Sequence, residues 1–273
     1  MNIIKNNPIL WVIILLFAQF STSCRVISNL TATNNGSTSN SSVNSSKNAT
    51  SGDNTGKDTP VICQNTYYPV GANIERKYHI DYQKAPVPDQ DYTERYTDFN
   101  GDGFVAKTEF KEVSTTINWR CTADGLLATQ YGNSIDMKSG SSAKIDTTNS
   151  KGVSFPVESR WKTGEKWSSK YDIKETLKNP NGSPLGGGDG TVSQASEVIG
   201  SEEVKVAAGT FQTIKVKNQT TLNITVKVGG MSVPTKTVVE TTAWFAKDVG
   251  MVKSETNMGG MGGATTELIS FKK

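Results

Sequence analysis

The chain has 273 residues, of which 20% are charged, and a formal net charge of +3. Charges of both signs are interspersed, so no basic stripe predicts nucleic-acid binding, and the length suffices for one well-buried domain. The chain contains a single histidine, so few catalytic arrangements that depend on an imidazole are possible.

The first 23 residues have the layout of a secretory signal peptide. One cation, Lys5, precedes an apolar run from Ile9 to Phe20, and the small residues Ser21–Ser23 follow. The apolar run is too short to cross a membrane comfortably as a helix. We therefore predict a signal peptide over residues 1–23 and export from the cytoplasm.

The small residues before Cys24 resemble a bacterial lipobox, in which the cysteine becomes the lipidated first residue of the mature protein. We predict lipid attachment, palmitate included, at Cys24, and a membrane anchor in the bacterial cell envelope. Arg25 stands where an aspartate commonly retains lipoproteins at the inner membrane, which favours the outer membrane or the cell surface. The alternative is a soluble protein that the ordinary signal peptidase cuts before Cys24.

Residues 24–60 are predicted to form a disordered tether. From Ser28 to Pro60 the chain consists mainly of Asn, Ser, Thr and Gly and has almost no large apolar side chains. Such a segment buries too little surface to offset the entropy that ordering would cost. The folded region is then a single β domain over residues 61–273.

Three cysteines are an odd number for an exported chain. With Cys24 assigned to the lipid, Cys63 and Cys121 remain as a predicted disulfide in an oxidising compartment. Such a bridge would close a loop of nearly sixty residues, and loop-closure entropy then gives a stabilisation of ~4 kcal/mol. Two free buried thiols are the alternative.

The folded region alternates polar residues with aromatic or β-branched residues, which predicts β-strands. Stretches such as NPNGSPLGGGDG (residues 179–190) separate them and predict turns or surface loops. Short strands joined by local turns indicate a mostly β fold, a single curved antiparallel sheet or half-barrel. The predicted strands are Glu75–Gln83, Tyr92–Phe99, Phe104–Val113, Thr115–Thr122, Ser193–Val206, Phe211–Val228, Thr235–Ala246, Gly250–Met258 and Ala264–Phe271.

The stretch DFNGDGFVAKTE, residues 98–109, matches the calcium-loop pattern D-x-[DN]-x-[DN]-G-x5-E at every specified position. In a calcium site, Asp98, Asn100 and Asp102 would provide side-chain oxygens, Phe104 its carbonyl and Glu109 both carboxylate oxygens. The flanking residues are typical of strands, so NGDG also fits a hairpin turn, which would place Glu109 too far along the return strand to bind the ion. The hairpin is the favoured prediction, and calcium is the only cofactor that the sequence suggests.

No catalytic motif is recognisable, because H-E-x-x-H, a P-loop and G-x-S-x-G are all missing from the sequence. His79 lies in an alternating strand, and a lone histidine there is usually structural or exposed. Carboxylates such as Glu94 and Asp172 are scattered. We predict that the protein is not an enzyme and has no catalytic residues.

Four phrases span most of the folded region: YYPVGANIERKY (Tyr67–Tyr78), WRCTADGL (Trp119–Leu126), VKVAAGTFQTIKVK (Val204–Lys217) and WFAKDVGMVKSE (Trp244–Glu255). In this order they resemble the TapB-like, largely uncharacterised surface lipoproteins of bacteria. The resemblance implies a curved antiparallel sheet similar to the lipoprotein-carrier folds of the cell envelope. It implies no established activity.

The predicted function is that of an exported, lipid-anchored envelope protein that acts as a non-catalytic binding or structural module. Its partners would be the membrane, through the N-terminal lipid, and either an apolar ligand on the concave side of the sheet or another envelope protein. An apolar ligand would require a contiguous apolar pocket there. The alternative is a calcium-binding surface adhesin or interaction protein that uses the 98–109 loop.

Overall fold

The structure is a computed structural model that describes residues 63–83, 88–111, 114–131, 135–136, 142–228, 231–259 and 262–273. The predicted signal peptide, the predicted tether and Cys24 lie outside the described residues. Within those ranges, no helix has the length and apolar content that crossing a membrane requires.

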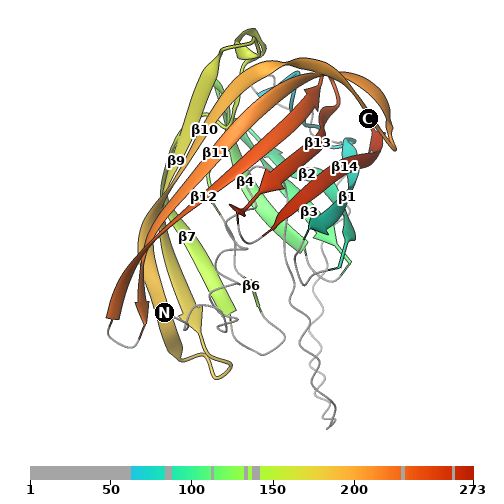
Figure 1. Ribbon diagram of the computed structural model, residues 1–273. Helices are drawn as coiled ribbons and strands as arrows, with labels where there is room; N and C mark the ends of the chain where they lie inside the picture. The colour runs from blue at the N-terminus through green and yellow to red at the C-terminus, as the bar shows by residue number, and fades with distance from the viewer. Residues whose placement is uncertain are drawn as a thin grey trace, which may run out of the picture.

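The described residues form one antiparallel sheet of fourteen strands (Figure 1). Its strand order is β6-β7-β9-β10-β11-β12-β13-β14-β1-β2-β3-β4-β5-β8. The prediction of a mostly β protein with a curved antiparallel sheet is confirmed. The strands are β1 (Glu75–Gln83), β2 (Gln90–Asn100), β3 (Gly103–Phe110), β4 (Ser114–Thr122), β5 (Gly125–Ala128), β6 (Ile135–Asp136), β7 (Ser142–Gly152), β8 (Phe155–Pro156), β9 (Lys166–Lys178), β10 (Pro184–Val206), β11 (Gly209–Val228), β12 (Met231–Ala246), β13 (Gly250–Asn257) and β14 (Gly263–Lys272), with a 3₁₀ helix at Glu158–Arg160.

Alternation of side chains along each strand separates a buried face from an exposed one. In β1, Tyr78, Ile80 and Tyr82 are buried, whereas His79 and Asp81 are exposed. We call the face with the buried side chains the concave face, because the sheet curls around it, and the opposite one the outer face. The predicted strand patterns of β1 to β4 are therefore confirmed.

The strands β10, β11 and β12 are unusually long, with 23, 20 and 16 residues. They curve from the lower left across the top of the molecule (Figure 1). β10 has an irregularity in its register between Val198 and Gly200, and such irregularities allow a strand to bend. The tip of the β10–β11 hairpin returns to the sheet, where Ala208 N donates a hydrogen bond to Leu268 O at 3.2 Å.

One predicted loop is corrected by the structure, because residues 184–190 belong to β10 rather than to a surface loop. Glycines disfavour strands in general, but here they pair with both β9 and β11. A Cβ atom on Gly190 would lie 2.4 Å from the carbonyl oxygen of Asn223, so only glycine fits at this position. The five strands from β5 to β9 were also missing from the predicted set.

The two ends of the sheet are joined by the segment that leads from β7 into β8. β7 pairs with β9, and Phe155 of β8 then pairs with Leu126 of β5. Ser154 N donates to Leu126 O at 2.8 Å, and Tyr131 N donates to Thr147 Oγ1 at 2.7 Å. These bonds hold the sheet in its curled form.

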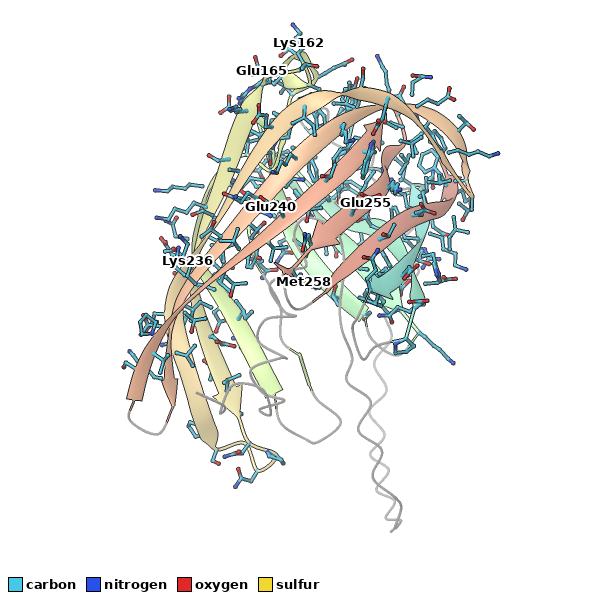
Figure 2. The ribbon with its side chains drawn as sticks, in the orientation of Figure 1. Lys162, Glu165, Lys236, Glu240, Glu255 and Met258 are labelled. Carbon is cyan, nitrogen blue, oxygen red and sulfur yellow. A yellow bond between two sulfur atoms is a disulfide. The ribbon has the colours of Figure 1, made fainter. Side chains whose placement is uncertain are left out.

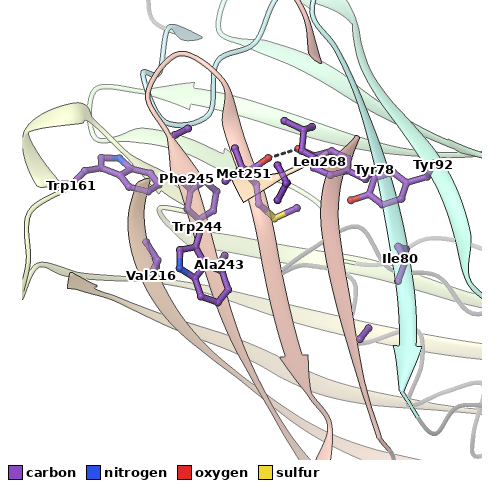
Figure 3. Packing of buried hydrophobic residues seen from close by; sticks show 14 of the residues in the cluster. Tyr78, Ile80, Tyr92, Trp161, Val216, Ala243, Trp244, Phe245, Met251 and Leu268 are labelled. Atoms are coloured by element: carbon purple, nitrogen blue, oxygen red, sulfur yellow. Dashed lines mark hydrogen bonds between the residues drawn. The ribbon is translucent and has the colours of Figure 1, made fainter. Parts of the chain in front are cut away.

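Three clusters of apolar side chains fill much of the concave face. Cluster 1 includes Tyr78, Phe245, Met251 and Leu268, from β1, β12, β13 and β14, and the Tyr78 hydroxyl donates to Met251 O at 2.9 Å (Figure 3). Cluster 2 lies on β7, β9, β10 and β11. Cluster 3 lies on β2 to β5 and the segment before β1.

The predicted disulfide is present in cluster 3. The Cys63 and Cys121 sulfur atoms are bonded, and both residues are buried. The bridge attaches the start of the described chain to β4, 58 residues away in sequence. The assignment of the third cysteine, Cys24, to a lipid stays a prediction.

Candidate ligand-binding site on the concave face

The residues of the predicted calcium loop form a β-hairpin between β2 and β3. Asn100 pairs with Gly103 at the turn, whereas Glu109 pairs with Thr93 at the other end of the hairpin. Thr93 precedes Asp98 by five residues, and five residues of strand span roughly 16 Å. The structure therefore brings Asp98, Asn100 and Asp102 to one turn and leaves Glu109 far from it.

Glu109 forms ion pairs with two cationic side chains on the outer face. Its carboxylate pairs with Arg95, and Lys107 Nζ lies 2.6 Å from its Oε1. The hydrogen bond from Lys107 is the main cause of a pKa below the ordinary value for Glu109. Phe104, the fourth predicted ligand, has its side chain buried in cluster 3. Across the described residues, no group of three or more His, Cys, Asp or Glu side chains could hold a metal ion.

The hairpin geometry predicts that calcium does not stabilise the protein. We expect the same melting temperature in millimolar calcium and in chelator, because a ligand specific to the folded state must raise it. Differential scanning calorimetry of the full chain would measure this. A calcium-dependent rise that Asp98→Asn abolishes would overturn the expectation and restore the loop as a metal site.

His79 lies exposed on the outer face of β1. Its Nδ1 is 2.8 Å from Asp91 Oδ1, and Lys77 Nζ is 2.8 Å from the other oxygen of Asp91. Hydrogen bonds from Lys77 and His79 are the main causes of a lowered pKa of Asp91. This exposed trio has the character of a surface ion-pair network.

The concave face contains a cavity of about 40 Å³, which we call the concave cavity. Its floor is polar and comes from β9, β10 and β11, whereas aromatic rings from β4, β8, β9 and β12 form its walls. Such a volume holds about three water-sized groups and is too small for an acyl chain. Among the described residues, the lining of this cavity is not the contiguous apolar pocket that an apolar ligand would require. The lining residues are Trp119, Val153, Ser154, Phe155, Trp167, Ser169, Gln194, Ser196, Val216, Asn218 and Phe245.

Strand register places the polar floor residues beside one another. Ser169 pairs with Gln194, and Ser196 pairs with Asn218. The Ser169 hydroxyl donates to Gln194 Oε1 at 3.0 Å. No charged side chain is among the described lining residues, so the cavity suits a neutral group.

The aromatic walls are held rigidly. Trp167 Nε1 donates to Ser154 O at 3.0 Å, and the Trp119 ring stacks on Phe104 and Phe155 with centroids 5.9 and 5.6 Å apart. Trp119 Nε1, in contrast, is buried without a hydrogen-bond partner. A buried donor without an acceptor destabilises the protein, and this nitrogen has almost no accessible surface, so it is not exposed to the cavity.

A wider groove of about 780 Å³ lies near the turn between β13 and β14. Its two carboxylates are paired: Glu240 Oε1 lies 3.4 Å from Lys217 Nζ, and Glu255 Oε1 lies 2.8 Å from Lys253 Nζ. Figure 2 labels Glu240, Glu255 and Met258 in this region. No aromatic ring is among its described lining residues, and both of its carboxylates are already paired, so we regard the concave cavity as the stronger candidate.

Sequence reasoning missed the floor of the cavity. The signal was nevertheless in the sequence, because Ser169, Gln194, Ser196 and Asn218 occupy inward positions of alternating strands, where apolar residues are usual. The β9 segment KWSSKYDIK shows it best, since Trp167 and Tyr171 flank Ser169 on the same face.

A family profile described as DUF3108-like matches residues 192–264, which run from β10 to the start of β14. Over this segment, the chain is similar to DUF3108-like proteins. The segment contains Gln194, Ser196, Val216, Asn218 and Phe245 of the cavity lining. The curated proteins include no match.

Solved structures of similar shape come from bacteria. An exported protein with a YmcC-like fold from Bacteroides fragilis is 14% identical with a TM-score of 0.45, and the match covers 77% of this chain and all of that one. A lipoprotein from Parabacteroides distasonis is 15% identical with a TM-score of 0.44, over 77% of this chain and 99% of that one. The hypothetical lipoprotein YmcC from Escherichia coli is 10% identical with a TM-score of 0.35, over 72% and 84%. The predicted resemblance to uncharacterised bacterial lipoproteins agrees with these descriptions, although the name TapB does not occur in them.

Proposed function

We propose that the protein is an exported, lipid-anchored module of the bacterial cell envelope that binds a small neutral group of a ligand in the concave cavity. The observation that carries the proposal is the lining, with rigid aromatic walls and an uncharged polar floor. Ligand pockets typically combine aromatic walls with a few polar groups that fix orientation.

The lining supports binding rather than catalysis. The serines of the lining have no histidine or carboxylate among the other described lining residues. A serine hydroxyl is a weak nucleophile unless an adjacent base activates it. The chain's single histidine, His79, is on the outer face in contact with Asp91.

Anchoring supports a role near a membrane surface. The predicted tether of residues 24–60 would have an end-to-end distance of roughly 35 Å as a flexible coil. The domain could then reach ligands close to the membrane while it remains attached through Cys24.

The anchor predicts a specific labelling pattern. Cells that express the full chain and grow with a fatty-acid analogue should label the wild type and not Cys24→Ala, because the lipid is attached through that thiol. Gel fluorescence after capture of the protein measures the label. Cys63→Ser is the matched control and should keep it. Equal labelling of wild type and Cys24→Ala would refute the anchor.

The ligand-binding proposal is tested by filling the cavity. Native mass spectrometry of the protein, incubated with a small-molecule extract of bacterial envelopes, should show a bound species with the wild type. Ser196→Leu should lose it, because the larger side chain occupies the concave cavity. Ser193→Leu is the control, since the same replacement then falls on the other face of β10. Identical spectra for wild type and Ser196→Leu would refute the proposed site.

A further inference from the structure

The floor of the concave cavity has amide groups whose hydrogen-bonding capacity the protein leaves partly unused. Gln194 Oε1 accepts from Ser169, and the described residues provide no acceptor for its Nε2. Asn218, opposite Ser196 in the sheet, adds an amide with both a donor and an acceptor.

The same cavity has an apolar side. Val216 and Phe245 lie on neighbouring strands, and both are buried in cluster 1. Water would satisfy the polar groups and leave these apolar surfaces without a matching contact. An acyl chain would do the reverse and leave the amides of Gln194 and Asn218 without a partner.

We propose that the concave cavity binds the acetamido group of an N-acetylated ligand. An acetamido group combines a carbonyl acceptor, one N–H donor and a methyl group, in four non-hydrogen atoms. The carbonyl oxygen matches the donor Gln194 Nε2, the N–H matches Asn218 Oδ1, and the methyl group matches Phe245. The cavity of about 40 Å³ accepts a group of this size while the rest of the ligand stays outside. The inference rests on the proposed function and names the ligand class for the same site.

Two kinds of compound carry this group, N-acetylated amino sugars and N-acetylated amino acids. Saturation-transfer difference NMR with the full-length protein would use N-acetylglucosamine and N-acetylglycine amide as probes, with glucose as the probe without an acetamido group. We expect millimolar binding of acetamido probes, because few ligand atoms become buried. The methyl protons should receive the most saturation. A sugar preference would show as tighter binding of N-acetylglucosamine than of N-acetylglycine amide.

Two leucine variants test the assigned contacts. Asn218→Leu removes the amide from the cavity and should weaken N-acetylglucosamine binding about tenfold, which corresponds to one lost hydrogen bond. Asn223→Leu is the matched control, because Asn223 is exposed on the other face of β11. Its affinity should equal that of the wild type. The melting temperature of each variant would establish that both are folded.

Three results would overturn the inference: equal binding of glucose and N-acetylglucosamine, saturation that falls mainly on ring protons, or equal loss of affinity in both leucine variants. An absence of binding by every acetamido probe would also overturn it. If native mass spectrometry still shows an envelope ligand that Ser196→Leu loses, the proposed function stands and only the acetamido assignment fails. If both experiments show nothing, the proposed function fails as well.

Discussion

Replacing Arg76 with methionine is expected to lower the free energy of unfolding by about 3–5 kcal/mol, because the change removes one partner of a buried ion pair. Arg76 is fully buried, and its Nη1 lies 3.0 Å from Glu94 Oε1. Without the guanidinium, the Glu94 carboxylate would remain buried with no cation beside it.

The guanidinium also joins separate segments of the chain. Nη2 donates to Pro69 O and Nε donates to Val249 O, each at 2.6 Å, and Nη1 also donates to the Tyr96 hydroxyl. The group lies 5.5–5.7 Å from the ring centroids of Tyr68, Tyr96 and Phe271. Burial alone would lower the pKa of Arg76, but Tyr96, Tyr78 and Glu94 raise it overall, so the side chain stays charged. Arg76 therefore fastens the segment before β1 and the β12–β13 turn to the concave face.

Urea unfolding followed by tryptophan fluorescence would measure the loss. Arg95→Met is the control, because Arg95 is exposed on the outer face and pairs with Glu75 and Glu109. Exposed pairs contribute about 0–1 kcal/mol each, so this variant should lose far less. The double variant Arg76→Met with Glu94→Leu should recover part of the loss, since no buried charge is left unpaired. An unchanged midpoint for Arg76→Met would contradict the role of the pair.

The parts of the fold that depend on local pattern were predictable from sequence. β1 and β3 alternate clearly, and the count of cysteines led to the Cys63–Cys121 bridge. The β2–β3 turn was also recognisable from the residues NGDG, although the left-handed backbone there is at Asp98, with a φ of 53°. In each case a few neighbouring residues determine the structure.

Features that depend on pairing between distant strands were not predictable. The glycines of β10 form a strand only because β9 and β11 flank them on both sides. The concave cavity forms only where Trp119, Phe155 and Phe245 lie against residues of β9 to β11. These residues are far apart in sequence, so no local pattern predicts their contact. The position of Glu109 depends on pairing in the same way, because the β2–β3 register places it away from the turn that holds Asp98, Asn100 and Asp102.

A second large effect is expected at Glu175, on the concave face of β9. Its neighbours on the same strand face are Ile173 and Leu177, and its partners across the sheet are Ile145 and Gly188. The residue is 2% exposed, and neither carboxylate oxygen has a hydrogen-bond partner. Burial without a compensating charge raises its pKa from 4.5 to about 7.

The raised pKa makes stability depend on pH in a defined direction. The neutral acid is tolerated in this apolar site, so the contribution of Glu175 to stability is fully present below its unfolded pKa of about 4.5 and is lost as pH rises through about 7. The difference between the two pKa values corresponds to about 3 kcal/mol. We expect Glu175→Gln to match the wild type near pH 4.5 and to be more stable by about 3 kcal/mol at pH 8.

Chemical unfolding of both proteins between pH 4.5 and 8 would measure this difference, because titrations shared by the two proteins cancel. Glu165→Gln is the control, since Glu165 (labelled in Figure 2) lies just before β9, is partly exposed and pairs with Arg160. Its stability should follow the wild type at every pH. Parallel pH profiles for wild type and Glu175→Gln would show that the carboxyl group is ionised without cost. A difference in the free energy of unfolding that develops between pH 4.5 and 8 would instead identify Glu175 as a group that destabilises the β7–β10 part of the sheet as the pH rises.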